Sequence, residues 1–264
     1  MRAPAKSVRG FERGSGLAAR VRSIAEPALA SPTVRRMCGR FTLTRSAAEV
    51  AEHFALNAAP HHTPRFNIAP TQLVLAIRAV PDGGRREAVQ LHWGLVPFWA
   101  EHARDAAQQI NARVETLTER PAFREAAQRR RCLVPADGFY EWRGARTTRE
   151  PFHIALPRGE LFAFAGLWER WQPPSGSPLE SVSIVTTAAA ESIRALHDRM
   201  PIVVDPAGYD AWLAPAQRDV REVLAQLPTT RTARLVARRV SVRANDVHND
   251  DARCLEQAEQ GTLF

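Results

Sequence analysis

The feature that most constrains the fold is a succession of short strand-like segments between residues 73 and 242. Leu73–Val80 is followed by the turn signal Pro81-Asp82-Gly83-Gly84 and by a second segment near Ala88–Trp93. Similar segments follow at Arg131–Pro135, Gly138–Arg143, Phe152–Leu156, Leu161–Trp168, Val182–Thr187, Ile202–Val204 and Leu235–Val242. Short connections favour antiparallel pairing of neighbouring strands. We therefore predict one α+β domain with a curled, mostly antiparallel, barrel-like sheet.

Short helices are expected to flank this sheet. Ser46, with Glu49 three residues later, is a capping-box signal for a helix from Ala47 to about Leu56. The prolines between His61 and Pro70 predict a loop. Other helices are expected over residues 120–130, 190–196, 208–213 and 216–227.

Charge divides the chain into a leader and a body. Residues 1–36 hold Lys6 and seven arginines against Glu12 and Glu26, which is +6 of the net +8 of the 264 residues. We exclude this basic stretch from the fold as a disordered leader. Three explanations of the leader remain open. The start codon is misassigned and Met37 is the real one, the leader is removed by processing, or it is a transit-like peptide. The folded domain is predicted over residues 37–250, with residues 251–264 as a C-terminal tail.

Composition excludes several classes of protein. No apolar run approaches the roughly 18 residues of a membrane span. Cys38, Cys132 and Cys254 are too few and too irregularly spaced for a disulfide framework or a metal site. We expect a cytoplasmic monomer that associates with the nucleoid when it is bound to DNA, without metal or cofactor.

Met37-Cys38-Gly39-Arg40 suggests unusual chemistry. If everything before Cys38 were removed, its α-amine and thiol would act on the same carbon of an aldehyde, because the amine forms a Schiff base and the thiol then closes a thiazolidine ring. An α-amine has a reference pKa of about 7.7–8.0 and is partly neutral near pH 7. Lys6 is the only lysine in the chain. A chain that begins at Cys38 would therefore hold a single primary amine.

Seven sequence blocks, in order, give the chain a resemblance to the SOS-response-associated peptidase (SRAP) family. They are Met37–Phe41, Phe66–Thr71, Trp93–Trp99, Ile110–Thr116, Arg131–Trp142, Phe164–Trp168 and Leu196–Pro201. The resemblance implies a protein of the DNA damage response that binds single-stranded DNA and crosslinks to abasic sites through the N-terminal cysteine. Strand-lyase activity and a self-cleavage that exposes the cysteine are further implied activities.

The resemblance also assigns catalytic roles. Cys38 would be the nucleophile, and Asn111 would orient the adduct through its amide. Glu141, between two aromatic residues, would move protons with a raised pKa. His197 would act as acid or base, or stabilise the imine and the ring oxygen. Taken alone, Asn111 also fits a turn or cap asparagine, and His197 fits a structural histidine better than a catalytic one. A solvated strand glutamate is the alternative for Glu141, but it fits a position between aromatic residues less well.

A second set of residues is expected to bind the DNA strand. Residues Trp93–Trp99 form an aromatic loop, whose end would stack on a base or wedge the strand at the lesion, and arginines would contact phosphates. The residues are Arg40, Asn67, Pro70, Phe98, Trp99, Arg113 and Arg199. The family often has two tryptophans at the end of this loop, whereas here Ala100 follows Trp99.

Other classes of function remain open from the sequence. An N-terminal-nucleophile amidotransferase also begins with a cysteine whose amine acts as base. A cysteine peptidase would use Cys38, His197 and Asn111 as a triad. A single-strand DNA binder without catalysis would bind and leave no adduct.

Overall fold

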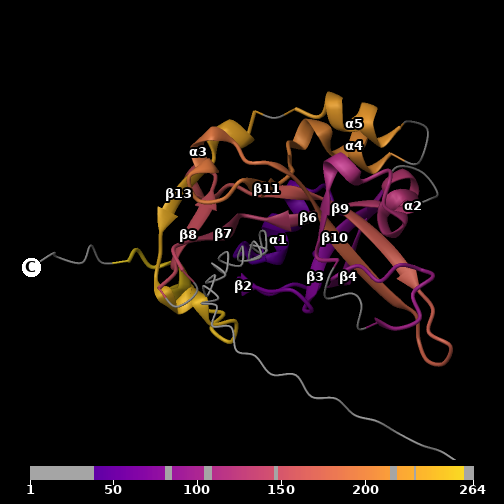
Figure 1. The fold of residues 1–264 in the computed structure, drawn as a ribbon, viewed down its shortest axis with the longest axis horizontal. Coiled ribbons are helices and arrows are strands. Elements are labelled where there is room, and N and C mark those ends of the chain that lie inside the picture. The colour runs from indigo at the N-terminus through magenta and orange to yellow at the C-terminus, as the bar shows by residue number, and fades with distance from the viewer. Residues whose placement is uncertain are drawn as a thin grey trace, which may run out of the picture. The chain divides into compact units, whose positions relative to one another are not determined.

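The computed structural model describes residues 39–80, 85–103, 109–145, 148–214, 219–228 and 230–258. Its larger sheet closes on itself (Figure 1). The strands of the ring, in order, are β10 (Leu179–Ala188), β4 (Arg86–Trp93), β3 (Leu73–Ala79), β6 (Arg131–Ala136) and β9 (Phe162–Trp171). Strand β9 pairs back with β10, and only the β10–β4 pair of the ring is parallel. The prediction of a curled, mostly antiparallel, barrel-like sheet is confirmed.

A second, five-stranded sheet is antiparallel throughout. Its order is β13 (Val236–Arg239), β8 (Glu150–Ala155), β7 (Gly138–Arg143), β1 (Phe41–Leu43) and β2 (Arg65–Ile68). Phe41 packs against Trp93 and Phe164 of the barrel, with ring centroids 5.2 and 5.7 Å apart. Phe139 of β7 contacts Phe164 at 6.0 Å. The main core therefore lies between this sheet and the barrel.

Short strands and helices complete the fold. Strands β5 (Asn111–Arg113) and β11 (Arg199–Pro201) pair with β10, and β12 (Val203–Val204) pairs with β9. The α-helices are α1 (Ala47–His53), α2 (Pro121–Arg129), α3 (Glu191–Arg194), α4 (Tyr209–Leu213) and α5 (Val220–Gln226). Single 3-10 turns cover Val114–Thr116, Pro157–Gly159, Pro206–Gly208, Thr232–Arg234, Val242–Asn245 and Ala252–Leu255. In Figure 1, α4 and α5 lie together at one side of the barrel.

The other face of the five-stranded sheet is covered by the end of the chain. Tyr140, Val240, Ala244 and Cys254 form a small second core there, with Phe66, Trp142 and Leu255 at its margin. We call residues 241–257 the C-terminal strap. Its last part is fixed by a bridge between Val240 and Gln257. The packed chain thus runs past residue 250, where the sequence suggested that a tail begins.

Local signals predicted most elements but missed several short strands, among them β1, β2 and β11. The capping box of Ser46 and Glu49 is present at the start of α1. Strand β1 has three residues, too few to show a pattern, and β2 lies between Pro64 and Pro70, where the prolines predicted a loop. The turn at residues 81–84 and the start of the helix predicted at residue 216 lie outside the described residues. In the part of the chain that is described, no helix is long and apolar enough to cross a membrane.

Candidate active site and nucleic-acid interface

The described chain begins at Gly39, the residue to which Cys38 is covalently attached; Cys38 itself lies outside the described residues. Phe41 of β1 pairs with Phe139 of β7, and the Tyr140 amide donates a hydrogen bond of 3.0 Å to the Arg40 carbonyl. This antiparallel register runs from Phe139 toward Glu141. The start of β1 is thereby bound along the strand that carries Glu141.

Glu141 is buried, with 4% of its surface exposed. It lies opposite Phe152 of β8 and two residues beyond Phe139 on the same strand. Side chains two apart on a strand share a face. Because Phe139 packs on the barrel, the Glu141 carboxyl also faces the barrel side of the sheet. A raised pKa for this group stays a prediction.

Asn111 and Arg113 lie on β5, which runs parallel to β10. Asn111 pairs with Ile184 and Arg113 with Thr186, so the two side chains occupy the same face of the strand. Asn111 is half-buried and Arg113 is exposed. The strand presents an amide and a guanidinium on the same face.

His197 lies in the turn before β11 and is 7% exposed. Its Nδ1 accepts a hydrogen bond of 3.0 Å from the Arg199 amide, which requires that Nδ1 carry no proton. The neutral ring then has its proton on Nε2. The Asp198 carboxylate also lies 3.0 Å from Nδ1, and its side chain is 86% exposed. A protonated ring would instead pair with Asp198.

Arg199 is already bound within the protein. Its guanidinium donates to both carboxylate oxygens of Glu115, at 2.5 and 2.9 Å, and to the Thr186 carbonyl at 2.8 Å. The hydrogen bond from Arg199 lowers the pKa of Glu115. Since Arg113 pairs with Thr186, Arg113 and Arg199 lie beside the same residue of β10.

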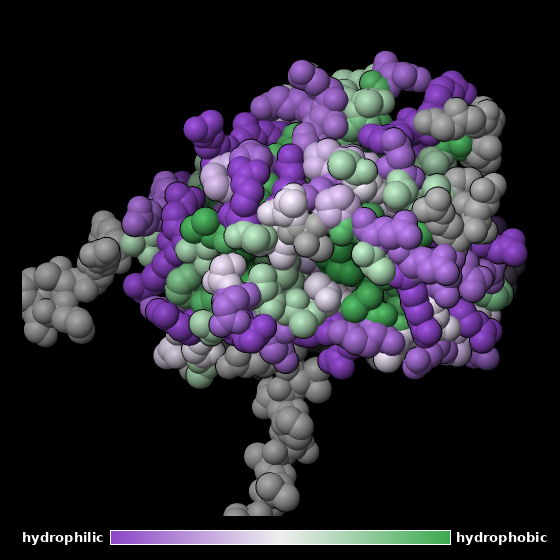
Figure 2. Space-filling view, turned by 90° about the horizontal axis from the view of Figure 1, so that it is seen from above, coloured by the Kyte–Doolittle hydropathy of each residue, from purple (hydrophilic) through white to green (hydrophobic). Residues whose placement is uncertain are grey.

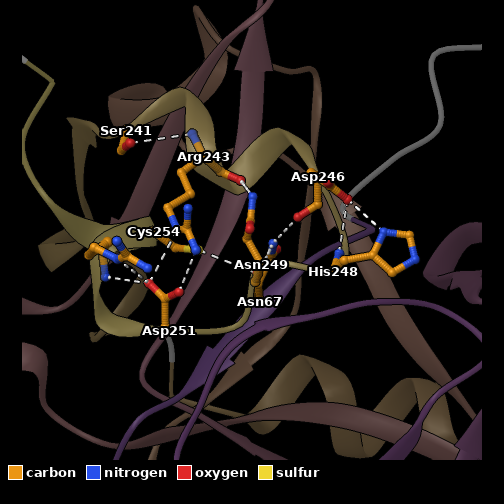
Figure 3. A network of polar contacts seen from close by, with 9 residues as sticks. Asn67, Ser241, Arg243, Asp246, His248, Asn249, Asp251 and Cys254 are labelled. Atoms are coloured by element: carbon orange, nitrogen blue, oxygen red, sulfur yellow. Dashed lines mark hydrogen bonds and ion pairs between the residues drawn. The ribbon is translucent and has the colours of Figure 1, made fainter.

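Arg40 and Asn67 form the centre of a buried polar network. The Arg40 guanidinium donates to the Asn67 Oδ1 at 2.8 Å and to the Ala244 carbonyl at 3.1 Å. The Asn67 amide in turn donates to the carbonyls of Ala244, Asp246 and Asn249. Figure 3 shows the strap curling around Asn67. Burial and the charge of Arg149 lower the pKa of Arg40.

Phe98 and Trp99 are the two large exposed aromatic side chains of the described residues, at 52% and 56% exposure. Two hydrogen bonds hold the backbone around them. The Leu95 amide donates to the Gln109 carbonyl, near Asn111, and the Trp171 indole donates to the Ala100 carbonyl at 2.6 Å. On the face shown in Figure 2, hydrophobic residues form small patches enclosed by hydrophilic ones. An exposed pair on a rigid loop is suited to stacking on bases.

Pro70 lies in the turn between β2 and β3. The next residue, Thr71, donates a backbone hydrogen bond of 2.8 Å to the Trp93 carbonyl and has a positive φ of 71°. The turn that contains Pro70 is thus attached to the start of the aromatic loop. Among the described residues, no group of three or more His, Cys, Asp or Glu side chains is arranged to hold a metal ion.

A known protein family matches most of the chain that forms this domain. A family described as SOS response associated peptidase (SRAP) matches residues 37–247. The chain belongs to the SRAP family. The match begins at Met37, and residues 1–36 lie outside it.

Relatives of this SRAP chain share the name abasic site processing protein. Abasic site processing protein YoqW of Bacillus subtilis is 37% identical over 224 residues, which cover 83% of this chain and 99% of the relative. Abasic site processing protein HMCES of Gallus gallus is 30% identical over 205 residues, or 68% of this chain and 60% of the relative.

Solved structures have the same fold. A protein from Bacteroides thetaiotaomicron superposes with a TM-score of 0.72 at 24% identity, covering 84% of this chain and 100% of that one. A protein from Bordetella bronchiseptica gives a TM-score of 0.65 at 27% identity, covering 77% and 100%.

The sequence did not single out the residues that hold the strap of this SRAP domain. Asp250 accepts hydrogen bonds from the amides of Phe66 and Asn67 and forms an ion pair with Arg65. These bonds cap the outer edge of β2. The available signal was the cluster of Asn and Asp residues between 245 and 251, side chains that commonly bond backbone groups.

Proposed function

We propose that this SRAP protein processes abasic sites in single-stranded DNA, and that it does so by forming a covalent crosslink through Cys38 once Cys38 is the N-terminal residue. The names of its relatives support the choice of lesion. The pairing of β1 with β7 supports the proposed mechanism. In this pairing the residues that follow Cys38 run alongside the strand that contains the buried Glu141.

The chemistry requires only the groups of one residue. The open form of an abasic deoxyribose has an aldehyde. The neutral α-amine of Cys38 adds to the carbonyl carbon, and loss of water gives an imine. The thiolate then bonds to the imine carbon, the nitrogen takes up a proton, and a five-membered thiazolidine results. No oxidant or cofactor enters this balance.

The neighbouring side chains would serve the proton transfers. Glu141, buried beside an apolar core, suits a carboxyl that gives and takes a proton during sugar opening and loss of water. His197, with its proton on Nε2, is suited to donate a hydrogen bond to an oxygen of the sugar. The Asn111 amide would orient the adduct from β5.

The DNA strand would follow the arginines and the aromatic loop. We propose that Arg113 and Arg199 bind phosphates near β10, that Phe98 and Trp99 stack on bases, and that the Pro70 turn borders the strand. Arg40 would bind phosphate from the opposite sheet. Asn67 is fully buried and bonded four times inside the protein, which supports a role in holding Arg40 more than direct contact with DNA.

The test is to incubate the chain beginning at Cys38 with a single-stranded oligonucleotide that has one abasic site, and to separate the products on a denaturing gel. A slow-migrating adduct is expected. Cys38→Ser keeps the amine and loses the thiol, so only a borohydride-trapped imine should remain. A chain that retains Met37 keeps the thiol, loses the free amine at Cys38 and should form no thiazolidine.

The site of attachment gives a second check. Because Lys6 is the only lysine of the chain, peptide mapping of the borohydride-trapped adduct of the Cys38-start protein should identify Cys38 alone. Absence of any adduct, or a Cys38→Ala variant that gives a stable adduct without borohydride, would refute the proposal.

A further inference from the structure

Trp142 lies between two positively charged side chains. It follows Glu141 on β7, and its ring has the Arg40 guanidinium carbon 5.7 Å from its centroid and the Arg149 guanidinium carbon at 5.2 Å. A guanidinium within about 6 Å of an indole is attracted by the face of the ring. Arg149 lies outside the seven sequence blocks.

Two asparagines hold this arrangement in place. The Asn245 Oδ1 accepts a hydrogen bond of 2.7 Å from the Trp142 indole, and its Nδ2 donates to the Arg149 carbonyl at 3.3 Å. Asn67 fixes Arg40 through its bond of 2.8 Å. The Trp142 ring, the Arg40 guanidinium and the Arg149 backbone are therefore positioned before any ligand arrives, which lowers the entropic cost of binding.

The charges around the ring are unbalanced. The positive charge of Arg149 is the second cause, after burial, of the lowered pKa of Arg40. Glu150, next in the chain, pairs with Arg143 at 2.8 Å and Arg239 at 2.7 Å instead. Arg149 forms no ion pair with any residue that the structure describes.

The carboxylate of Asp246 offsets only part of the positive charge of the two guanidinium groups. It is among the groups that raise the pKa of Arg40, but its carboxylate bonds the amide of His248 at 3.0 Å and the His248 ring at 2.8 Å. Two guanidiniums brought together with so little opposing charge favour binding of an anion.

We propose that Arg149, together with Arg40 and Trp142, binds one phosphodiester of the single strand. Guanidinium groups suit phosphate oxygens because they donate paired hydrogen bonds in a fixed plane. The inference rests on the proposed function for the identity of the ligand. It adds a backbone contact on the five-stranded sheet, away from Arg113 and Arg199 on β5 and β11.

The experiment measures binding of the full chain and its Arg149→Gln variant to an undamaged single-stranded oligonucleotide by fluorescence anisotropy across a salt series. Loss of one phosphate contact on single-stranded DNA should reduce the slope of log affinity against log salt by about 0.7. Affinity at low salt should fall about tenfold. Arg149→Lys should retain the slope and lose part of the affinity, because it keeps the charge without the paired donors.

Arg143→Gln is the matched control. Arg143 is exposed on the same strand as Trp142, but its charge is paired with Glu150 and its guanidinium carbon lies 4.9 Å from the Phe152 ring centroid. Its slope should equal that of the wild type. Thermal unfolding of each variant checks that the fold is kept.

The outcomes separate the two proposals. An unchanged slope in a folded Arg149→Gln variant, or a wild-type chain that does not bind single-stranded DNA, overturns the phosphate site. Binding with the expected slope change but no adduct on abasic DNA overturns only the crosslinking chemistry.

Discussion

Asn67→Ala offers the sharpest test of how this fold is held together. Asn67 is completely buried, and its side chain joins the start of β1, through Arg40, to three carbonyls of the strap. The Nδ2 group of Asn67 has two protons, so we count its contacts with the three carbonyls as two full hydrogen bonds. With about 1 kcal/mol for each and about 2 kcal/mol for the bond from a charged donor, the loss in free energy of unfolding is roughly 4 kcal/mol.

Urea denaturation at neutral pH measures this loss. Asn249→Ala is the matched control, because that side chain makes one strap bond, from its Nδ2 to the Arg243 carbonyl at 2.9 Å, and does not contact Arg40. The control should cost about 1 kcal/mol. A loss below about 1 kcal/mol for Asn67→Ala, or equal losses for the two variants, would show that the network is not the link between the strap and β1.

Three further predictions concern the aromatic loop, pH and the Arg199 ion pair. Because both rings are exposed, Trp99→Ala and Phe98→Ala should leave the midpoint of unfolding nearly unchanged. Each variant should weaken binding to single-stranded DNA, measured by anisotropy, by about 1–3 kcal/mol for the lost stack. Affinities equal to that of the wild type would contradict the role of the loop. Burial lowers the pKa of His153 to about 3. The unfolded state then binds a proton below about pH 6.5 that the folded state excludes, so stability should fall as pH drops from 6.5 toward 3, by up to about 1.4 kcal/mol per pH unit. His153→Gln should flatten urea-derived stability between pH 6.5 and 5, and an unchanged slope would refute this cause. Glu115→Gln should tighten DNA binding roughly threefold by releasing Arg199, and it should not weaken it.

The strap links the two ends of the domain in a way that bears on reactivity. Arg40 is two residues from Cys38 in the sequence, and its side chain is bonded to a strap carbonyl more than two hundred positions later. A reagent at a chain terminus is ordinarily free to move. In the proposed mechanism that reagent is Cys38. The residues that follow it are fixed by a paired strand and a buried guanidinium, which would preorganise the terminus for bond formation.

Local patterns in the sequence determined much of this protein. The capping box at Ser46, the strand pairs separated by Gly and Pro turns and the buried runs of β6 and β9 follow from short-range preferences, so the elements and the α+β class could be predicted. The order of seven motif blocks was specific enough for the family. The proposal that Cys38 reacts through its own amine also rests on residue types, because no lysine follows Lys6.

Tertiary structure decided the partners of those residues. Closure of the barrel by the β9–β10 pair and the face on which Glu141 lies depend on contacts between distant segments, which carry no local signal. The same holds for Asn67, which sequence suggested as a DNA contact and which is buried under the strap. A buried polar group must be bonded wherever the fold places it. Which groups those are becomes known only when the strands are packed.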